Sequence, residues 1–198
     1  TSAAVPPPAP WIIPERSVPM MQRSDLTWVV LQLKALGIDD VLHFDFVSPP
    51  APAALARALE LLYALGAIDS TGALDGAGLG LAMAQMPLPP QLSRMLLASL
   101  ELGCSEEALS LAAVLSVQNP FVDPRGRSSL NERLDAAVAE LGAREGDHVT
   151  FVRVFNEFRD MADADAHEWC QEHMLRARAL RRAVEIRAQL ARHLRRFA

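Results

Sequence analysis

The sequence predicts a mainly α-helical protein with two helical domains. Alanine and leucine dominate the composition, whereas valine, isoleucine and threonine are too few for a large sheet. Apolar residues recur at helical spacing along most of the chain, and 51% hydrophobic with 22% charged residues is a globular composition. Prolines at 87, 89 and 90 interrupt the helical pattern and place a domain boundary near residue 88.

Three segments follow from these observations. Residues 1–20 hold six of the fourteen prolines and are expected to form a linker or an extended arm. Residues 21–88 form the first domain, in which the order helix, strand, helix and hairpin predicts a winged helix. Residues 89–198 form the second domain, a bundle in which every predicted element is a helix.

The individual elements are predicted from apolar spacing, capping residues and glycine or proline stops. Those of the first domain are a helix at Leu26–Leu36 after the cap candidates Ser24 and Asp25 and before Gly37, a short strand or extended segment at Val41–Val47, a helix at Pro52–Leu65 before Gly66, a hairpin with a tight turn at Ile68–Leu74, and a weak helix at Gly76–Gln85. Those of the second domain are helices at Gln91–Leu102, Ser105–Val117, Leu130–Leu141, His148–Met161 and Trp169–Phe197.

The charges are unevenly distributed. Residues 169–198 contain eight arginines and two glutamates, a charge of +6, whereas the rest of the sequence carries −11. Such an asymmetry indicates either an internal electrostatic contact or a surface for a polyanion.

Several kinds of site are excluded by the residues available. A phosphate-binding P-loop needs a lysine, but the only lysine, Lys34, lies in the middle of a predicted helix. His167, Cys170 and His173 are spaced three apart, so a regular helix does not point all three at one metal ion. Cys170 has no orienting third group beside His173 and is expected to pack in the core. We therefore predict no catalytic residue and no metal ligand.

The cellular setting is predicted from cysteine and apolar patterning. Cys104 and Cys170 lack a paired spacing, which favours a reducing, intracellular environment. No apolar run reaches about 18 residues and no secretory signal is visible, so contact with a membrane is not expected.

Groups of residues along the chain resemble the DEAH-box RNA helicases. The first domain is similar to their winged-helix region at Met21-Gln22-Arg23-Ser24-Asp25-Leu26, Val30-Leu31-Gln32-Leu33-Lys34-Ala35-Leu36-Gly37-Ile38, Phe44-Asp45-Phe46, Pro49-Pro50 and Ala58-Leu59-Glu60-Leu61-Leu62-Tyr63-Ala64-Leu65-Gly66. The second is similar to their ratchet (helicase-associated, HA2) domain at Pro87-Leu88, Pro90, Met95-Leu96-Leu97, Gly103-Cys104-Ser105, Leu115-Ser116-Val117-Gln118-Asn119, Gly146-Asp147-His148, Trp169-Cys170 and Arg187-Ala188-Gln189-Leu190. The order of these groups along the chain makes the resemblance specific.

This resemblance implies a function. In the family, two RecA-like domains hydrolyse ATP with Mg²⁺, and the winged-helix, ratchet and OB-fold domains close a channel around single-stranded RNA. Glycine-patch activator proteins dock on the winged helix. The sequence contains no RecA motif and no OB-fold after Ala198, so it is expected to be a middle segment without cofactor or ATPase activity of its own. The resemblance also implies a nuclear, spliceosomal setting.

The sequence departs from the family pattern at three places. Leu74–Gln85 lacks the usual threonine and basic residues, and Arg125–Glu145 is longer than usual. Arg176-Ala177-Arg178 replaces a common Asn-Tyr-Arg or Asn-Tyr-Lys, so an aromatic contact is missing there, and base stacking is expected to be weaker.

The resemblance and the polar residues together give a candidate RNA interface. It comprises the end of one helix, the turn before another and arginines of the last helix: Ser116, Gln118, Asn119, Gly146, Asp147, His148, Arg176, Arg178, Arg182 and Arg187. Asp147 is also predicted as a helix N-cap, beside which backbone amides favour phosphate. The alternative function is a non-catalytic scaffold that mediates protein contacts in a ribonucleoprotein, which a net charge of −5 favours. A DNA-reading winged helix is disfavoured because the Leu55–Leu65 helix has only one basic residue, Arg57.

A helical wheel refines the prediction for the basic segment. Six of its eight arginines point away from the apolar face, and Arg176 and Arg187 lie at the edge of that face. For Arg187 this position predicts a buried carboxylate or an RNA phosphate as partner. The predicted apolar face consists of Ala179, Ala183, Ile186, Leu190, Leu194 and Phe197.

Overall fold

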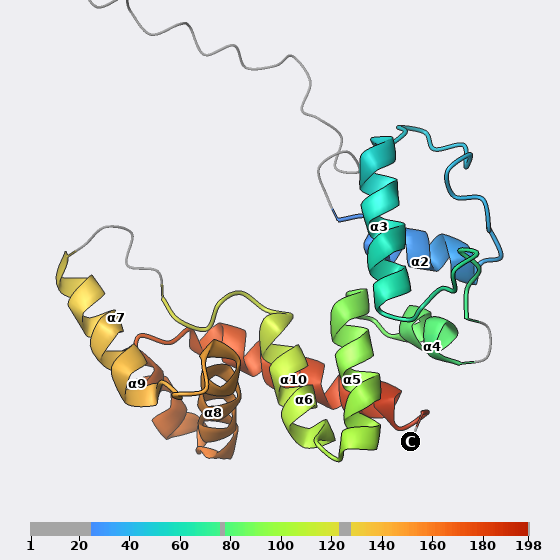
Figure 1. Cartoon of the computed structure of the whole chain (residues 1–198). Helices are drawn as coiled ribbons and strands as arrows, with labels where there is room; N and C mark the ends of the chain where they lie inside the picture. Colours follow the sequence, from blue (N-terminus) through green and yellow to red (C-terminus); the bar gives the residue numbers. More distant parts are fainter. Residues whose placement is uncertain (1–24, 76–77, 123–127, 198) are drawn as a thin grey trace, which may run out of the picture.

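The computed structural model describes residues 25–75, 78–122 and 128–197 (Figure 1). The predicted proline-rich arm at 1–20 lies outside these residues. Within them the chain forms nine helices, and its β structure is limited to two isolated bridges. The prediction of a mainly α-helical protein is therefore confirmed.

The N-terminal unit packs three helices around one apolar cluster. These helices are α2 (Thr27–Ala35), α3 (Pro52–Ala64) and α4 (Leu79–Gln85). Val30, Leu31 and Leu62 are fully buried in the cluster, and Met83 of α4 closes it from the other side. Both glycine stops are confirmed, because Gly37 and Gly66 follow their helices with positive φ angles of 86° and 73°.

Of the two alternatives predicted for Val41–Val47, the strand is wrong. The segment contains turns and bends and pairs with no strand among the described residues, and Val47 is fully exposed. Phe44 and Phe46 instead contact each other edge to face, with ring centroids 4.8 Å apart. An alternating pattern alone does not produce a strand when no neighbouring edge accepts its backbone hydrogen bonds.

The predicted hairpin is reduced to a tight turn. Ile68 and Leu74 form a single antiparallel bridge. Asp69 closes the turn, because its Oδ1 accepts hydrogen bonds from the backbone amide of Thr71 at 2.8 Å and from that of Ala73 at 3.1 Å. The assignment of this unit as a winged helix stays a prediction.

Lys34 connects the turn to α2 from inside the unit. Its side chain is 5% exposed, and its Nζ donates hydrogen bonds to the backbone carbonyls of Asp39, at 2.7 Å, and Gly72. These bonds satisfy two carbonyls and hold the loop after α2 against the tip of the turn.

Gly80 explains why a poor helix former lies in α4. A Cβ atom at this position would overlap the backbone carbonyl of Ala67, so the helix packs closely against the turn only with glycine. The predicted helix at 76–85 is confirmed from Leu79 onward, and residues 76–77 lie outside the described part.

The C-terminal unit contains six helices. They are α5 (Pro90–Leu102), α6 (Ser105–Leu115), α7 (Ser128–Leu141), α8 (Asp147–Asp160), α9 (Asp163–Glu172) and α10 (Ala177–Leu194). The helix α5 begins at Pro90, one residue before the predicted start at Gln91, because proline is favoured in the first turn of a helix. Glu106 and Glu107 occupy the first turn of α6, where the helix dipole favours negative charge.

The predicted single helix at Trp169–Phe197 is wrong, because it is broken into α9 and α10. Met174, between them, adopts a left-handed conformation with φ of 54°. Its carbonyl accepts a hydrogen bond from the Val122 amide at 2.7 Å, and the Arg176 amide donates to the Pro120 carbonyl at 2.7 Å. The distant segment 120–122 therefore takes the backbone groups that a continuous helix would pair internally.

The helix α10 contacts three apolar clusters in turn. Leu180 joins the cluster of α7, α8 and α9, and Ala183 joins a second cluster with α6 and α8. Leu190 and Leu194 join a third with α5 and α6. The predicted apolar face of the basic segment is confirmed at Ala183, Leu190 and Leu194. Leu180, which is fully buried, was not included in the predicted face, and it packs against a different cluster, that of α7, α8 and α9.

None of the helices in the described ranges is both long enough and apolar enough to cross a membrane.

Replacing Lys34 with methionine is expected to destabilise the N-terminal unit. Methionine keeps most of the side-chain volume but removes both hydrogen bonds, so the Gly72 carbonyl loses its donor, whereas the Asp39 carbonyl keeps the Val41 amide at 3.2 Å. The expected loss is about 1.5–3 kcal/mol of unfolding free energy. Urea unfolding of the full chain measures the difference. Arg57→Met on the exposed surface of α3 is the control and is expected to change stability by less than about 0.5 kcal/mol. Equal stability of Lys34→Met and the parent would contradict this role.

Candidate functional site

A cavity of about 750 Å³ lies between the end of α6 and the beginning of α10. Five of the predicted interface residues lie along it, contributed by segments about sixty positions apart in the sequence. The cavity is lined by Ser116, Val117, Gln118, Arg176, Ala177, Arg178, Ala179, Arg182 and Ile186.

The end of α6 and the residues that follow it contribute the uncharged polar side chains of the cavity. Ser116 is its C-terminal cap residue, and the hydroxyl donates a hydrogen bond to the Ala112 carbonyl at 2.7 Å, which leaves its oxygen lone pairs available. Gln118, two residues further on, is exposed. Both side chains therefore offer hydrogen-bonding groups at the cavity.

The first turn of α10 supplies positive charge from both backbone and side chains. The amides of Ala177 and Arg178 precede the first internal hydrogen bonds of the helix and have no partner in the described part of the chain. The guanidinium of Arg178 is exposed and likewise unpaired within the described ranges. Arg182, one turn further on, makes only an exposed ion pair with Glu185 at 2.6 Å, which is worth at most about 1 kcal/mol. This end of the cavity therefore favours an anion.

Arg176 is used inside the protein. Its Nη1 donates hydrogen bonds to the carbonyls of Asn119, at 2.7 Å, and Phe121, at 2.6 Å. The Asn119 side chain also acts locally, because its Oδ1 accepts a hydrogen bond from the Phe121 amide at 2.9 Å. Arg176 and Asn119 therefore hold the segment 119–121 against the start of α10 and shape one end of the cavity.

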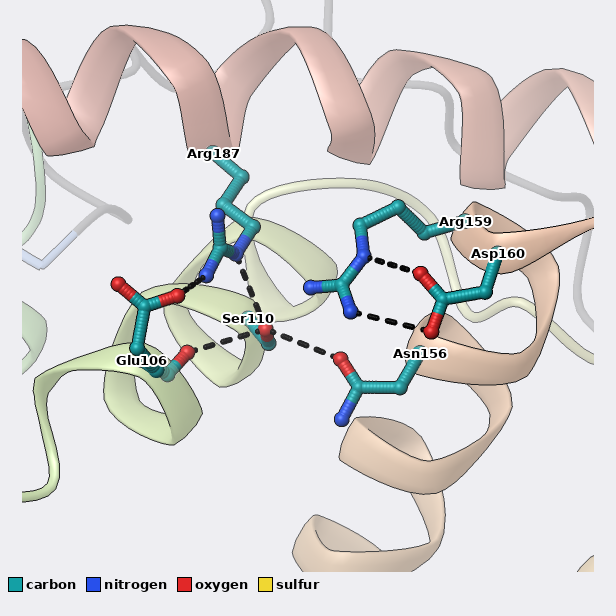
Figure 2. A network of polar contacts seen from close by, with 6 residues as sticks. All are labelled: Glu106, Ser110, Asn156, Arg159, Asp160 and Arg187. Atoms are coloured by element: carbon teal, nitrogen blue, oxygen red, sulfur yellow. Dashed lines mark hydrogen bonds and ion pairs between the residues drawn. The ribbon is translucent and has the colours of Figure 1, made fainter.

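Arg187 lies on α10, where it contacts residues of α6 (Figure 2), and it is not among the residues that line the cavity. It forms an ion pair with Glu106, and its Nε donates to the Ser110 hydroxyl at 3.1 Å. The predicted carboxylate partner is thus present, but its side chain is 79% exposed, whereas that of Arg187 is 16% exposed. The prediction that this carboxylate is buried is therefore wrong.

The turn Gly146, Asp147 and His148 does not line the cavity. All three residues are exposed at the start of α8. The N-cap prediction for Asp147 is wrong, since Gly146, with φ of 115°, occupies the cap position and Asp147 is the first helical residue. The predicted RNA contact of this turn stays a prediction.

The apolar lining was missed by sequence reasoning. Val117, Ala177, Ala179 and Ile186 form the non-polar part of the cavity wall. Ile186 had been assigned to the apolar face of the last helix, and Val117 to the end of a predicted helix. The only signal in the sequence for a role at the cavity was that these residues are neighbours of the predicted polar residues.

Cys170 is buried in the cluster of α7, α8 and α9, and burial raises the pKa of its thiol to about 11. The nearby Arg181 lowers this pKa by a smaller amount. The neighbouring histidines are engaged elsewhere: His167 contacts Gln171 at 2.8 Å, and His173 contacts the Trp169 carbonyl at 2.9 Å. A protonated thiol is a poor nucleophile, which agrees with the predicted packing role.

The fold and the cavity define a helical module with an arginine-lined cleft. Residues 89–151 match the family model described as helicase associated domain (HA2), ratchet-like. The whole chain is similar to proteins named probable ATP-dependent RNA helicase DHX35, with 45% identity to that of Pongo abelii and 44% to that of Homo sapiens over 93% of the chain. It is 42% identical over 91% of its length to the pre-mRNA-splicing factor ATP-dependent RNA helicase prp22 of Schizosaccharomyces pombe.

Residues 89–151 therefore match a ratchet-like helicase-associated domain, and most of the chain is similar to one part of proteins that are named ATP-dependent RNA helicases. It spans 25% and 26% of the two DHX35 proteins and 15% of prp22.

The variants Arg176→Ala and Arg178→Ala are expected to differ in stability, because Arg176 is hydrogen-bonded within the protein and Arg178 is exposed. Loss of Arg176 removes two charge-assisted hydrogen bonds to carbonyls and is expected to lower the unfolding free energy by about 1–3 kcal/mol. Loss of Arg178, an exposed residue without a partner in the described ranges, is expected to change it by less than about 0.5 kcal/mol. Urea unfolding of the two variants makes the comparison, and equal effects would contradict it.

The two cysteines are expected to differ in reactivity. Because the pKa of Cys170 is raised to about 11, its thiol is protonated at pH 8 and shielded from solvent. Iodoacetamide at this pH is expected to modify Cys104, which is half-buried, much faster than Cys170. Mass spectrometry of native and urea-unfolded protein measures both rates. Similar rates in the native protein would contradict the burial of Cys170.

Proposed function

We propose that this chain is an RNA-channel module of an ATP-dependent RNA helicase, which grips single-stranded RNA in the cavity between α6 and α10. The observation that carries the proposal is the convergence of Ser116, Gln118, Arg178 and Arg182 on one cavity. Its unpaired amides and guanidinium suit an RNA phosphate, and the Gln118 amide suits a sugar or base edge. The names of the relatives, which are RNA helicases, support the same ligand.

In the proposed parent protein, this module works with domains that do the chemistry. RecA-like domains would bind ATP and Mg²⁺, and an OB-fold would complete the channel around the strand, so the present chain needs no cofactor. A glycine-patch activator would dock on the N-terminal unit, which is a winged helix in this proposal. The splicing-factor name of one relative supports a nuclear, spliceosomal setting.

The second candidate is a scaffold that binds proteins in a ribonucleoprotein. It is supported by large apolar side chains on the surface of the N-terminal unit: Trp28, Leu36, Leu42 and Tyr63 are 48%, 78%, 56% and 58% exposed. Exposed apolar groups of this size are typical of protein contacts. This candidate requires no affinity of the cavity for RNA.

Single-stranded RNA binding by the full chain distinguishes the two candidates. Arg178→Ala is expected to weaken binding about threefold to tenfold and to reduce the salt dependence by about one phosphate contact. Gln118→Ala is expected to weaken binding about twofold to tenfold, since one hydrogen bond is lost. Fluorescence anisotropy with a labelled oligonucleotide at several salt concentrations measures both effects.

The matched control is Arg57→Ala on α3. Arg57 is also an exposed arginine without an ion pair in the described ranges, but it lies in the N-terminal unit. It is expected to leave affinity nearly unchanged. Equal affinity of all three variants and the parent would remove the cavity from the RNA interface and favour the scaffold.

A further inference from the structure

Side chains of three helices, α6, α8 and α10, meet in a polar network (Figure 2). At its centre is Ser110 of α6, whose hydroxyl is buried and accepts a hydrogen bond from Nε of Arg187. The same hydroxyl lies 3.1 Å from the Glu106 carbonyl and 3.4 Å from Oδ1 of Asn156 on α8. The ion pair between Arg187 and Glu106 completes the connection between α6 and α10.

Two arginines lie near Ser110, and the negative charge of Glu106 acts on both of them. Figure 2 shows the guanidinium groups of Arg187 and Arg159 on two sides of this serine. Asp160 chiefly raises the pKa of Arg159, and the negative charge of Glu106 raises it further. Asp160 therefore neutralises most of the charge of Arg159, and Glu106 pairs with Arg187 and also acts on Arg159.

The network fixes α10 on one side of the cavity. The helices α6 and α10 run antiparallel, because Arg187 meets the start of α6 while the first turn of α10 faces its end. Arg178 is nine positions before Arg187, or roughly 14 Å along a helix at 1.5 Å per residue. Arg176 holds the opposite end through the carbonyls of Asn119 and Phe121. Arg178 and Arg182, which line the cavity, thus lie on α10 between the contacts that Arg176 and Arg187 make.

We propose that Arg187 is a positioning residue: the Glu106–Arg187–Ser110 contact sets the place of the α10 wall, and through it the RNA affinity of Arg178 and Arg182. The proposal rests on the proposed RNA function of the cavity. It also assigns Arg187 a role different from direct contact with RNA. In that other role, Glu106 would compete with RNA phosphate for the same guanidinium.

Neutralising Glu106 separates the two roles, since they predict opposite signs. With a positioning role, Glu106→Gln loosens α10 and weakens single-stranded RNA binding about threefold to tenfold. With a direct role, the same change frees Arg187 and strengthens binding. The matched control is Glu107→Gln, which removes the same charge from the same first turn without touching Arg187. Its affinity is expected to equal or slightly exceed that of the parent.

Two further variants exclude a merely structural role. Arg187→Lys keeps the charge but lacks the guanidinium fork that reaches Glu106 and Ser110 together, so it is expected to behave like Glu106→Gln. In an Arg178→Ala, Arg182→Ala background, Glu106→Gln is expected to have no further effect on affinity. Melting temperatures are recorded in parallel, and all affinities are measured well below them. A lower melting temperature with unchanged affinity would overturn the proposal.

A geometric measurement tests positioning without RNA. Spin labels at Leu115→Cys and Arg181→Cys, in a Cys104→Ser background, report the separation of α6 and α10 by pulsed electron resonance. The distance distribution is expected to be narrow in the parent and in Glu107→Gln, and shifted or broadened in Glu106→Gln. An unchanged distribution would overturn the positioning role. A different result would be that the parent does not bind RNA although Glu106→Gln still shifts the distance distribution. That result would overturn the proposed function and the effect on affinity, but not the role of the contact in positioning α10.

Discussion

The close antiparallel packing of α6 and α10 is the contact on which the C-terminal unit depends. Ala112, Ala113 and Ala183 are fully buried in the clusters that join these helices, and side chains of this size let two helix axes approach closely. Leu190 and Leu194 lie in the same contact region and contribute roughly 1.5–3 kcal/mol each by burial. Because α10 also reaches the cluster of α7, α8 and α9 through Leu180, a shift of this one helix would disturb three clusters together.

The cavity is a consequence of how that pair of helices ends. The helix α6 ends at Leu115, and α10 begins at Ala177. The residues after the end of α6 and those of the first turns of α10 face each other across the cavity. The segment 120–122 takes the backbone groups of Met174 and Arg176, which prevents α9 and α10 from merging. If they merged, the amides of Ala177 and Arg178 would be paired within the helix. The break in the helix thus creates the positive end of the cavity.

The sequence predicted most helices because their apolar spacing and their glycine and proline stops are local signals. It predicted the residues of the cavity largely from a resemblance and not from spacing, since Ser116 and Arg178 are distant in sequence. Three features depended on non-local contacts and were not predictable. The segment 120–122 breaks the last helix, Val41–Val47 has no partner strand within the described ranges, and Glu106 pairs with Arg187 on a distant helix. No local pattern encodes which distant backbone or carboxylate a group will meet.

A net charge of −5 is compatible with a polyanion ligand because the relevant field is local. Exposed charges farther away than about 8–10 Å are largely screened at physiological ionic strength. Of the arginines near the cavity, Arg176 and Arg187 are bound to carbonyls, a hydroxyl and a carboxylate, so they contribute mainly to structure. Arg178 and the free amides of α10 are the groups whose charge is not already compensated by a close partner in the described ranges. In the proposed RNA function, a small number of uncompensated donors at one end of a cleft would give a weak, localised affinity. Such an affinity would suit a module that releases a strand as readily as it holds it, whereas a uniformly basic surface would hold RNA everywhere along the molecule.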